Sequence, residues 1–323
     1  MQALGCCAED ILKIDAASES ERIAAVIRET IFLQFKRKGA VVAVSGGIDS
    51  AVVAALCVNA LGADNVIALL LPEAESSPDS LRLGKQLADE LGVPSIVEDI
   101  TTTLQAAGCY RRRDEAIRMV LPEYTRGWIS KIVLPNLVES DSYAVFSLVA
   151  QSPEGETRKV RLSLPAYLGI LAATNFKQRT RKMMEYYYAD RYHFAVAGTP
   201  NRLELDLGFF VKNGDGSADL KPIGHLYKSQ VYQLAAHLGI PEEIQKRPST
   251  TDTYSLAQSQ EEFYFSLPLD KMDLCLYGTD HAMPPEDLAG IAGLTTEQVV
   301  RAYEMIEAKR KSARYLKSTA IMA

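Results

Sequence analysis

The sequence predicts an α/β protein: a doubly wound parallel sheet flanked by helices, with an inserted β-hairpin region around residues 101–164. Short apolar runs of strand length alternate with amphipathic runs of helix length over residues 20–100. A turn with two adjacent glycines, at 45–50, joins the first strand-like run to an apolar helix. The alternation stops at residue 101 and returns at residue 165. Such an order is typical of a parallel sheet with helices on both faces.

The first part of the chain contains three predicted strands and three predicted helices. The strands are uniformly apolar, as expected of central strands buried on both faces. Ser77-Pro78 reads as an N-cap followed by proline at the first helical position, and Gly92 suits the left-handed end of the same helix. In chain order the elements are helix 20–38, strand 41–44, helix 49–61, strand 66–71, helix 78–91 and strand 94–100.

The insertion interrupts this alternation of strands and helices. Residues 143–151 and 157–164 have strand character and flank the turn Ser152-Pro153-Glu154-Gly155, which predicts a hairpin. Short helices and turns are expected before it. We expect the triplet Arg111-Arg112-Arg113 on a solvated helix face, with an anion site as the alternative.

The rest of the chain returns to the helix and strand order, and we expect residues 1–323 to form a single domain. A polar stretch without clear periodicity, 247–262, is predicted to be an active-site loop or lid. The other predicted elements are helix 165–188, strand 193–197, helix 201–207, a glycine turn at 212–216, helix 226–238 and helices at 288–293 and 296–310.

Composition narrows the function classes. The formal net charge of −6 argues against a nucleic-acid binder, because such proteins neutralise phosphates with excess lysine and arginine. The five cysteines are odd in number and form no C-x-x-C pair, which argues against a disulfide framework or a zinc site. No apolar run approaches the roughly 20 residues of a membrane span, and the N-terminus is not a secretory signal. We therefore expect a cytoplasmic protein.

The turn Ser45-Gly46-Gly47-Ile48-Asp49-Ser50 is the strongest candidate site. Gly46 and Gly47 have no Cβ, so backbone N–H groups can approach an anion, and the helix that follows adds the positive end of its dipole. No lysine closes the loop as in a Walker A motif, so a P-loop kinase or GTPase is disfavoured. The alternative is a tight turn in which Ser50 is a plain N-cap.

Ser-Gly-Gly-x-Asp-Ser resembles the pyrophosphate loop of the N-type ATP pyrophosphatases, and further segments resemble the ammonia-dependent NAD synthetases in particular. The segments are Ser45 to Ser50, Asn175 to Arg181 (similar to N-x-x-A-R-x-R), Gly198 to Glu204 (G-T-x-x-x-E), Lys212 to Gly216 (K-Y-G-D-G) and Pro222 to Val231 (P-I-G-x-L-Y-K-x-Q-V). The resemblance implies a homodimer that adenylates a carboxylate with Mg-ATP and then lets ammonia displace AMP to form an amide.

The same resemblance implies roles for individual residues. We expect Asp49 and Glu204 to bind Mg²⁺, which favours oxygen ligands shared with substrate phosphates. Asp49, Lys228 and Arg179 are the predicted catalytic residues, with Lys228 as a point charge on the phosphates and Arg179 at the ATP end. The predicted ATP contacts are Ser45, Gly46, Gly47, Asp49, Ser50, Leu71, Thr199, Lys228 and Ser249. The predicted contacts to the acid substrate are Asn175, Lys212, Asp215, Lys309 and Arg310.

Simpler structural interpretations remain for three of these residues. Glu204 could be a surface carboxylate, Lys228 an exposed lysine near a helix start, and Asp215 a turn former.

Departures from the family pattern fall where the acid substrate is expected to bind. They are Thr250 to Tyr254, the stretch Glu261-Glu262-Phe263-Tyr264-Phe265-Ser266 in place of D-E-x-E-L-G, and Ala308-Lys309-Arg310 in place of His-Lys-Arg.

The first hypothesis is an NAD synthetase that acts on nicotinic acid adenine dinucleotide, with ammonia free or supplied by a separate glutaminase. The second is a related amide ligase for another carboxylate. A non-catalytic adenine-nucleotide sensor and a tRNA-modifying adenylase are the remaining alternatives.

Overall fold

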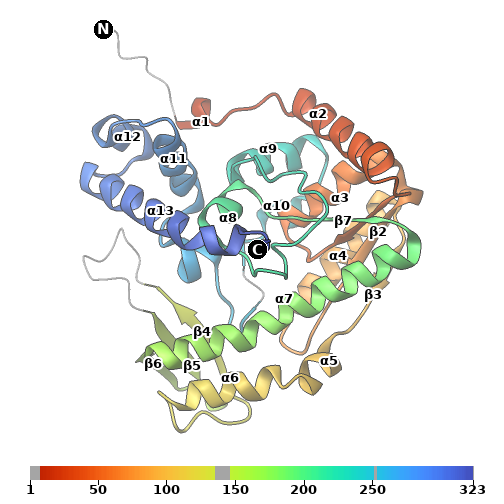
Figure 1. Cartoon of the computed structure of the whole chain (residues 1–323). Helices are drawn as coiled ribbons and strands as arrows, with labels where there is room; N and C mark the ends of the chain where they lie inside the picture. Colours follow the sequence, from red (N-terminus) through yellow and green to blue (C-terminus); the bar gives the residue numbers. More distant parts are fainter. Residues whose placement is uncertain (1–7, 135–145, 251–252, 323) are drawn as a thin grey trace.

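The computed structural model describes residues 8–134, 146–250 and 253–322. Its central sheet has parallel strands in the order β3-β2-β1-β7 (Figure 1). The strands are β1 (Ala40–Ala43), β2 (Val66–Leu70), β3 (Ser95–Val97) and β7 (Ala195–Ala197). Val42 of β1 lies opposite Ala68 of β2 and Ala197 of β7. The predicted doubly wound parallel sheet is confirmed, with the third strand shorter than expected.

Helices cover both faces of this sheet. Val42 and Val44 pack against the first group of helices, whereas Val41 packs against the second. The first group is α2 (Ala16–Arg28), α3 (Ile48–Leu61), α4 (Pro78–Leu91), α9 (Lys228–His237) and α10 (Glu242–Lys246). The second group is α5 (Thr101–Ala106), α6 (Cys109–Arg118) and α7 (Leu164–Tyr192). Three further short segments are α1 (Ala8–Ile11), the π-helix η1 (Glu29–Gln34) and the 3₁₀ turn η2 (Ala63–Asn65).

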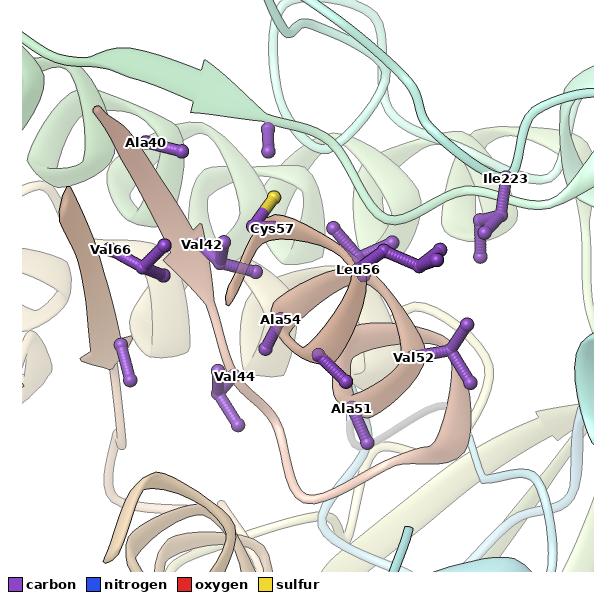
Figure 2. Packing of buried hydrophobic residues seen from close by; sticks show 14 of the residues in the cluster. Ala40, Val42, Val44, Ala51, Val52, Ala54, Leu56, Cys57, Val66 and Ile223 are labelled. Atoms are coloured by element: carbon purple, nitrogen blue, oxygen red, sulfur yellow. The ribbon is translucent and has the colours of Figure 1, made fainter. Parts of the chain in front are cut away.

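The turn between β1 and α3 lies in the largest apolar cluster (Figure 2). Val42 and Val44 lie beside Ala54 and Cys57 of α3 in this view, and all four side chains are buried. Small and β-branched residues allow the helix to pack closely on the strand. The glycine turn therefore starts from a strand and ends in a helix that the core holds in place.

The insertion forms a second sheet rather than a lone hairpin. Its antiparallel order is β4-β5-β6, with β4 (Ile129–Val133), β5 (Ser147–Gln151) and β6 (Thr157–Arg161). The predicted hairpin is confirmed as β5 and β6, although residues 143–145 lie outside the described residues. The expectation of only turns and helices before it was wrong, because Ser130 and Ile132 of β4 are buried in a short alternating strand.

A C-terminal group of helices packs beside the central sheet (Figure 1). It contains α8 (Arg202–Leu207), α11 (Leu269–Asp280), α12 (Pro285–Ala292) and α13 (Thr296–Lys317). The short π-helix η3 (Glu261–Phe265) precedes α11. Among the described helices, none is both long enough and apolar enough to cross a bilayer. Cys57, Cys109 and Cys275 are buried free thiols.

Candidate active site

A cavity of about 500 Å³ opens at the carboxyl ends of β1, β2 and β7. Ligands bind doubly wound sheets at this edge. Ser45 follows β1, Leu71 follows β2 and Thr199 follows β7, and all three line the cavity. One face of α7 forms a long wall, and residues 247–250 with Thr253 and Tyr254 complete the rim. Part of the predicted loop at 247–262 therefore lines the cavity.

The turn after β1 is held by its own serines. The Ser45 N–H donates to Ser50 Oγ at 3.2 Å, and the Ser50 hydroxyl donates to the Gly47 carbonyl at 2.9 Å. Gly46 has a φ of 72°, and a Cβ there would lie 2.7 Å from the Ser80 carbonyl oxygen. Gly47, not Ser50, is the N-cap of α3, so the interpretation of Ser50 as a plain N-cap was wrong. The positive end of the α3 dipole thus lies beside the cavity, as an anion site requires.

Asp49 is held between two long-range partners. Its Oδ1 accepts a hydrogen bond from Asn201 Nδ2 at 3.0 Å, and its Oδ2 forms an ion pair with Lys228 Nζ. The Lys228 side chain is only 2% exposed, which rejects the interpretation of an exposed lysine. Although burial opposes its charge, Asp49 and Glu204 raise the pKa of Lys228 above its usual range. A fixed cation therefore stands next to the phosphate loop.

Glu204 is the second carboxylate of the site. It is at the third position of α8, where it exchanges backbone hydrogen bonds of 3.1 Å with Asn201 in a capping box. Gln260 donates to its other oxygen at 3.3 Å. Burial and the charge of Asp49 raise the pKa of Glu204 to about 8. Glu204 is thus no surface carboxylate. Its ionisation beside Asp49 costs free energy unless a further cation binds between the two carboxylates.

Asp273 of α11 positions Lys228. Its two carboxylate oxygens accept from the backbone N–H groups of Lys228 (3.2 Å) and Ser229 (2.7 Å), which begin α9. Burial raises the pKa of Asp273 to about 6.

Removing this cap with Asp273→Ala should lower the free energy of unfolding by about 1–2 kcal/mol and reduce kcat. Urea denaturation and steady-state turnover check this, with the exposed Asp270→Ala as control. A variant that is as stable and as active as the wild-type protein would contradict the positioning role.

A buried ion-pair network anchors the cavity wall. Lys177 of α7 is fully buried and contacts Glu73 at 2.8 Å, Glu75 at 2.7 Å and the Thr253 carbonyl at 2.8 Å. Arg113 of α6 pairs with the same Glu75 at 2.5 Å and is 6% exposed. The expectation that Arg113 lies on a solvated face was therefore wrong. The network joins the segment after β2 and the segment at Thr253 to α7, so it fixes both rims of the cavity.

Comparison with known proteins identifies the family. The sequence model of the NAD synthase family matches residues 19–121 and 159–314, and so omits most of the inserted sheet. A relative from Rhizobium meliloti (strain 1021), named NH(3)-dependent NAD(+) synthetase, is 58% identical over 307 residues, covering 95% of this chain and 92% of the relative. The chain belongs to the NAD synthase family.

Two further relationships agree with this membership in the NAD synthase family. A Mesorhizobium japonicum protein of the same name is 54% identical over 313 residues, 97% of this chain and 98% of the relative. The solved NH3-dependent NAD synthetase from Campylobacter jejuni superposes with a TM-score of 0.62 at 23% identity, covering 96% of this chain and all of that one. The structural likeness shows a shared fold.

The cavity brings together most of the residues that the sequence singled out. Those in its wall are Ser45, Gly47, Asp49, Ser50, Leu71, Asn175, Thr199, Glu204, Asp215 and Ser249. Gly46 belongs to the same turn, and Lys228 reaches the site through Asp49. Asp215 does form the turn, since its oxygen accepts from the Val211 N–H at 2.7 Å, and it also lines the cavity.

Besides Gly46 and Lys228, four predicted residues do not line the cavity. Arg179 donates to the Lys212 carbonyl at 3.2 Å, and the Lys212 ammonium contacts the Tyr315 carbonyl at 2.8 Å. Lys309 donates to the Tyr264 carbonyl at 2.8 Å, and Arg310 pairs with Asp206 and Asp280. Each cation therefore has a protein partner elsewhere. Their roles in substrate binding remain predictions.

Two arginines that the sequence reading missed do line the cavity. Arg181 donates to the Leu71 carbonyl at 3.2 Å, and Arg247 donates to the Gly46 carbonyl at 3.2 Å. Arg181 lies three residues after the cavity-lining Gln178 and so on the same face of α7, whereas Arg179 is turned about 100° from Gln178. Nothing in the sequence alone marked Gln178 as the cavity side. Nothing local in the sequence indicated that Arg247 would fold back onto the glycine turn.

Proposed function

We propose that this protein is an ammonia-dependent NAD synthetase that converts nicotinic acid adenine dinucleotide to NAD with ATP. The observation that carries the proposal is the junction of the phosphate loop with Asp49, Lys228 and Glu204 at one end of the cavity. The relatives named NH(3)-dependent NAD(+) synthetase support the substrate assignment. ATP is the adenylating substrate of this family.

The reaction takes two steps. A carboxylate oxygen of the acid attacks the α-phosphorus of ATP, and the bond to pyrophosphate breaks. The ammonia nitrogen then attacks the acyl carbon, loses a proton and displaces AMP. Both steps develop negative charge on phosphate oxygens, which the N–H groups of the loop and the Lys228 ammonium stabilise. Arg181 and Arg247 add positive charge at the cavity wall. The catalytic role of Arg179 remains a prediction.

Asp49 and Glu204 are the residues that would hold Mg²⁺. The donor set fits a hard divalent ion that shares its remaining positions with phosphate oxygens, because both groups are carboxylates and lie close enough for Asp49 to raise the pKa of Glu204. No described group of three or more histidine, cysteine or acidic residues forms a cage of its own. A bound Mg²⁺ would neutralise charge on the leaving pyrophosphate.

The proposal also covers partners. A homodimer is supported by the apolar side chains that α7 exposes, Leu168, Met183 and Tyr187 among them. Ammonia would arrive free or from a separate glutaminase, and Asn175, Lys212, Asp215, Lys309 and Arg310 remain the proposed contacts to the acid. We place the reaction in the cytoplasm, without nucleic-acid or membrane partners.

Binding of Mg²⁺ should depend on pH. Because the pKa of Glu204 is raised from its ordinary 4.5 to about 8, the free protein keeps this carboxyl protonated at pH 7, and its contribution to stability is lost as pH rises toward 8. Mg²⁺ with a non-hydrolysable ATP analogue should therefore release about one proton per site at pH 7 and less at pH 9. Titration calorimetry in buffers of different ionisation enthalpy measures this. Equal release at both pH values would contradict it.

One assay separates the proposal from its alternatives. AMP, and pyrophosphate beyond about one per active site, should appear only when Mg-ATP, ammonium and nicotinic acid adenine dinucleotide are all present, because the first step releases pyrophosphate before ammonia attacks. Release with a different acid alone would favour the related amide ligase, and nucleotide binding without any release would favour a sensor.

A further inference from the structure

The inserted sheet lies next to a wall of the active site. Figure 1 shows it beside the start of α7, the helix that forms the long wall of the cavity. Its strands β4 and β5 fall in the part of the chain that the family model leaves unmatched, between residues 121 and 159. The 253–260 segment, which reaches the cavity through Tyr254 and Gln260, contacts this sheet directly.

Three hydrogen bonds join β4 to the 253–260 segment. The Ser130 N–H donates to Ser255 Oγ at 2.9 Å, and the Leu256 N–H donates to the Ser130 carbonyl at 3.2 Å. The side-chain amide of the buried Gln258 donates to the Ile132 carbonyl. Neither Ser255 nor Gln258 lines the cavity. The middle of the segment is therefore bound to the insertion and not to the groups of the site.

The start of the segment is anchored by burial and by charge. The Tyr254 side chain is 7% exposed and packs in the same apolar cluster as Ile132 and Leu148 of the inserted sheet. The buried Lys177 ammonium donates to the Thr253 carbonyl at 2.8 Å. Fixing a loop in one conformation costs conformational entropy. Because these contacts offset that cost within the protein itself, the segment is ordered before any substrate binds.

The end of the segment reaches the acidic pair. The Gln260 N–H donates to the Ser249 carbonyl at 2.9 Å, and its side chain, which is 8% exposed, donates to Glu204 Oε1 at 3.3 Å. The Asn201 N–H donates to the other oxygen of Glu204 at 3.1 Å. Both oxygens of this carboxylate are thus held from outside, and each keeps a further lone pair for a cation. Such partners orient the carboxylates that bind metals.

We propose that the inserted sheet is a positioning element of the active site: it holds the 253–260 segment so that Gln260 orients the Glu204 carboxylate for a divalent cation. Gln260 is then a positioning residue, because it acts through Glu204. The inference rests on the proposed function in one respect, the assignment of Mg²⁺ to Asp49 and Glu204.

Gln260→Met tests the last link in the full-length protein, since it keeps the length of the side chain and removes the donor. The affinity for Mg²⁺, measured by titration calorimetry on the complex with a non-hydrolysable ATP analogue, should fall about tenfold. The KM for nicotinic acid adenine dinucleotide should stay within twofold of wild type, and kcat should recover at saturating Mg²⁺. The matched control is Gln105→Met, which changes an exposed glutamine of α5 outside the cavity wall.

A double variant, Ser255→Ala with Gln258→Met, tests the link to the insertion. Amide hydrogen exchange of peptides from the 253–260 segment should become about tenfold faster in the ligand-free protein, as expected for the loss of two hydrogen bonds. Exchange in the central sheet should not change. The affinity for Mg²⁺ should fall as well, although neither side chain lines the cavity. If the double variant does not fold, Ser255→Ala alone is measured in the same way.

Three outcomes would overturn the inference. Unchanged exchange in the segment would show that the insertion does not hold it. Faster exchange with wild-type Mg²⁺ affinity would separate the segment from Glu204. A loss of kcat in Gln260→Met that saturating Mg²⁺ does not restore would make Gln260 a substrate contact. Exchange and Mg²⁺ affinity are both measured without the acid, so absence of NAD formation by the wild-type protein would refute the proposed function alone.

Discussion

Glu204→Gln should lower kcat by about two orders of magnitude or more while ATP still binds. The variant keeps the shape of the side chain and removes the negative charge that would hold a cation next to the developing pyrophosphate charge. It should fold normally, because the buried Glu204 is protonated in the free protein at pH 7. Steady-state turnover at saturating Mg²⁺ and equilibrium ATP binding measure the two effects.

The matched control for this variant is the exposed Glu286→Gln on α12, which should leave kcat unchanged. Near-normal turnover of Glu204→Gln at saturating Mg²⁺ would remove Glu204 from the catalytic site.

Lys228→Met should reduce both stability and turnover. Removing one member of a buried ion pair leaves Asp49 without its cation, which costs about 3–5 kcal/mol of unfolding free energy. Turnover should fall by about two to three orders of magnitude, because the variant loses the ammonium that pairs with Asp49 beside the loop. Urea denaturation and single-turnover pyrophosphate release provide the two measurements.

A second variant separates the two effects. Adding Asp49→Asn to Lys228→Met removes the unpaired charge, so much of the lost stability should return while turnover stays low. Unchanged low stability of the double variant would contradict the unpaired charge as the cause of the loss, and near-normal turnover of Lys228→Met itself would show that catalysis does not need the ammonium.

Local patterns in the sequence were sufficient for the central sheet and the phosphate loop. The apolar run at β1, the two glycines and the buried α3 are contiguous, so their packing follows from residues next to each other. The order of strands and helices then places Ser45, Leu71 and Thr199 at one edge, because parallel strands end together.

The contacts that local patterns could not predict join distant segments. Lys177 and Glu73 are 104 residues apart, and Asp273 and Lys228 are 45 residues apart. A charged residue looks solvated in sequence until its partner is known, which is why Arg113 was placed on a surface. Strand β4 was missed for a related reason, since the polar Ser130 occupies one of its buried positions and binds the 253–260 segment.

Isotope transfer tests the central claim most directly. Nicotinic acid adenine dinucleotide with ¹⁸O in both carboxylate oxygens is incubated with the protein, Mg-ATP and ammonium. The masses of the products are then measured by mass spectrometry. Adenylation of the carboxylate predicts one ¹⁸O atom in the phosphate of AMP, with unlabelled pyrophosphate and an amide that keeps the other. Label in inorganic phosphate alongside ADP, or none in AMP, would contradict the account.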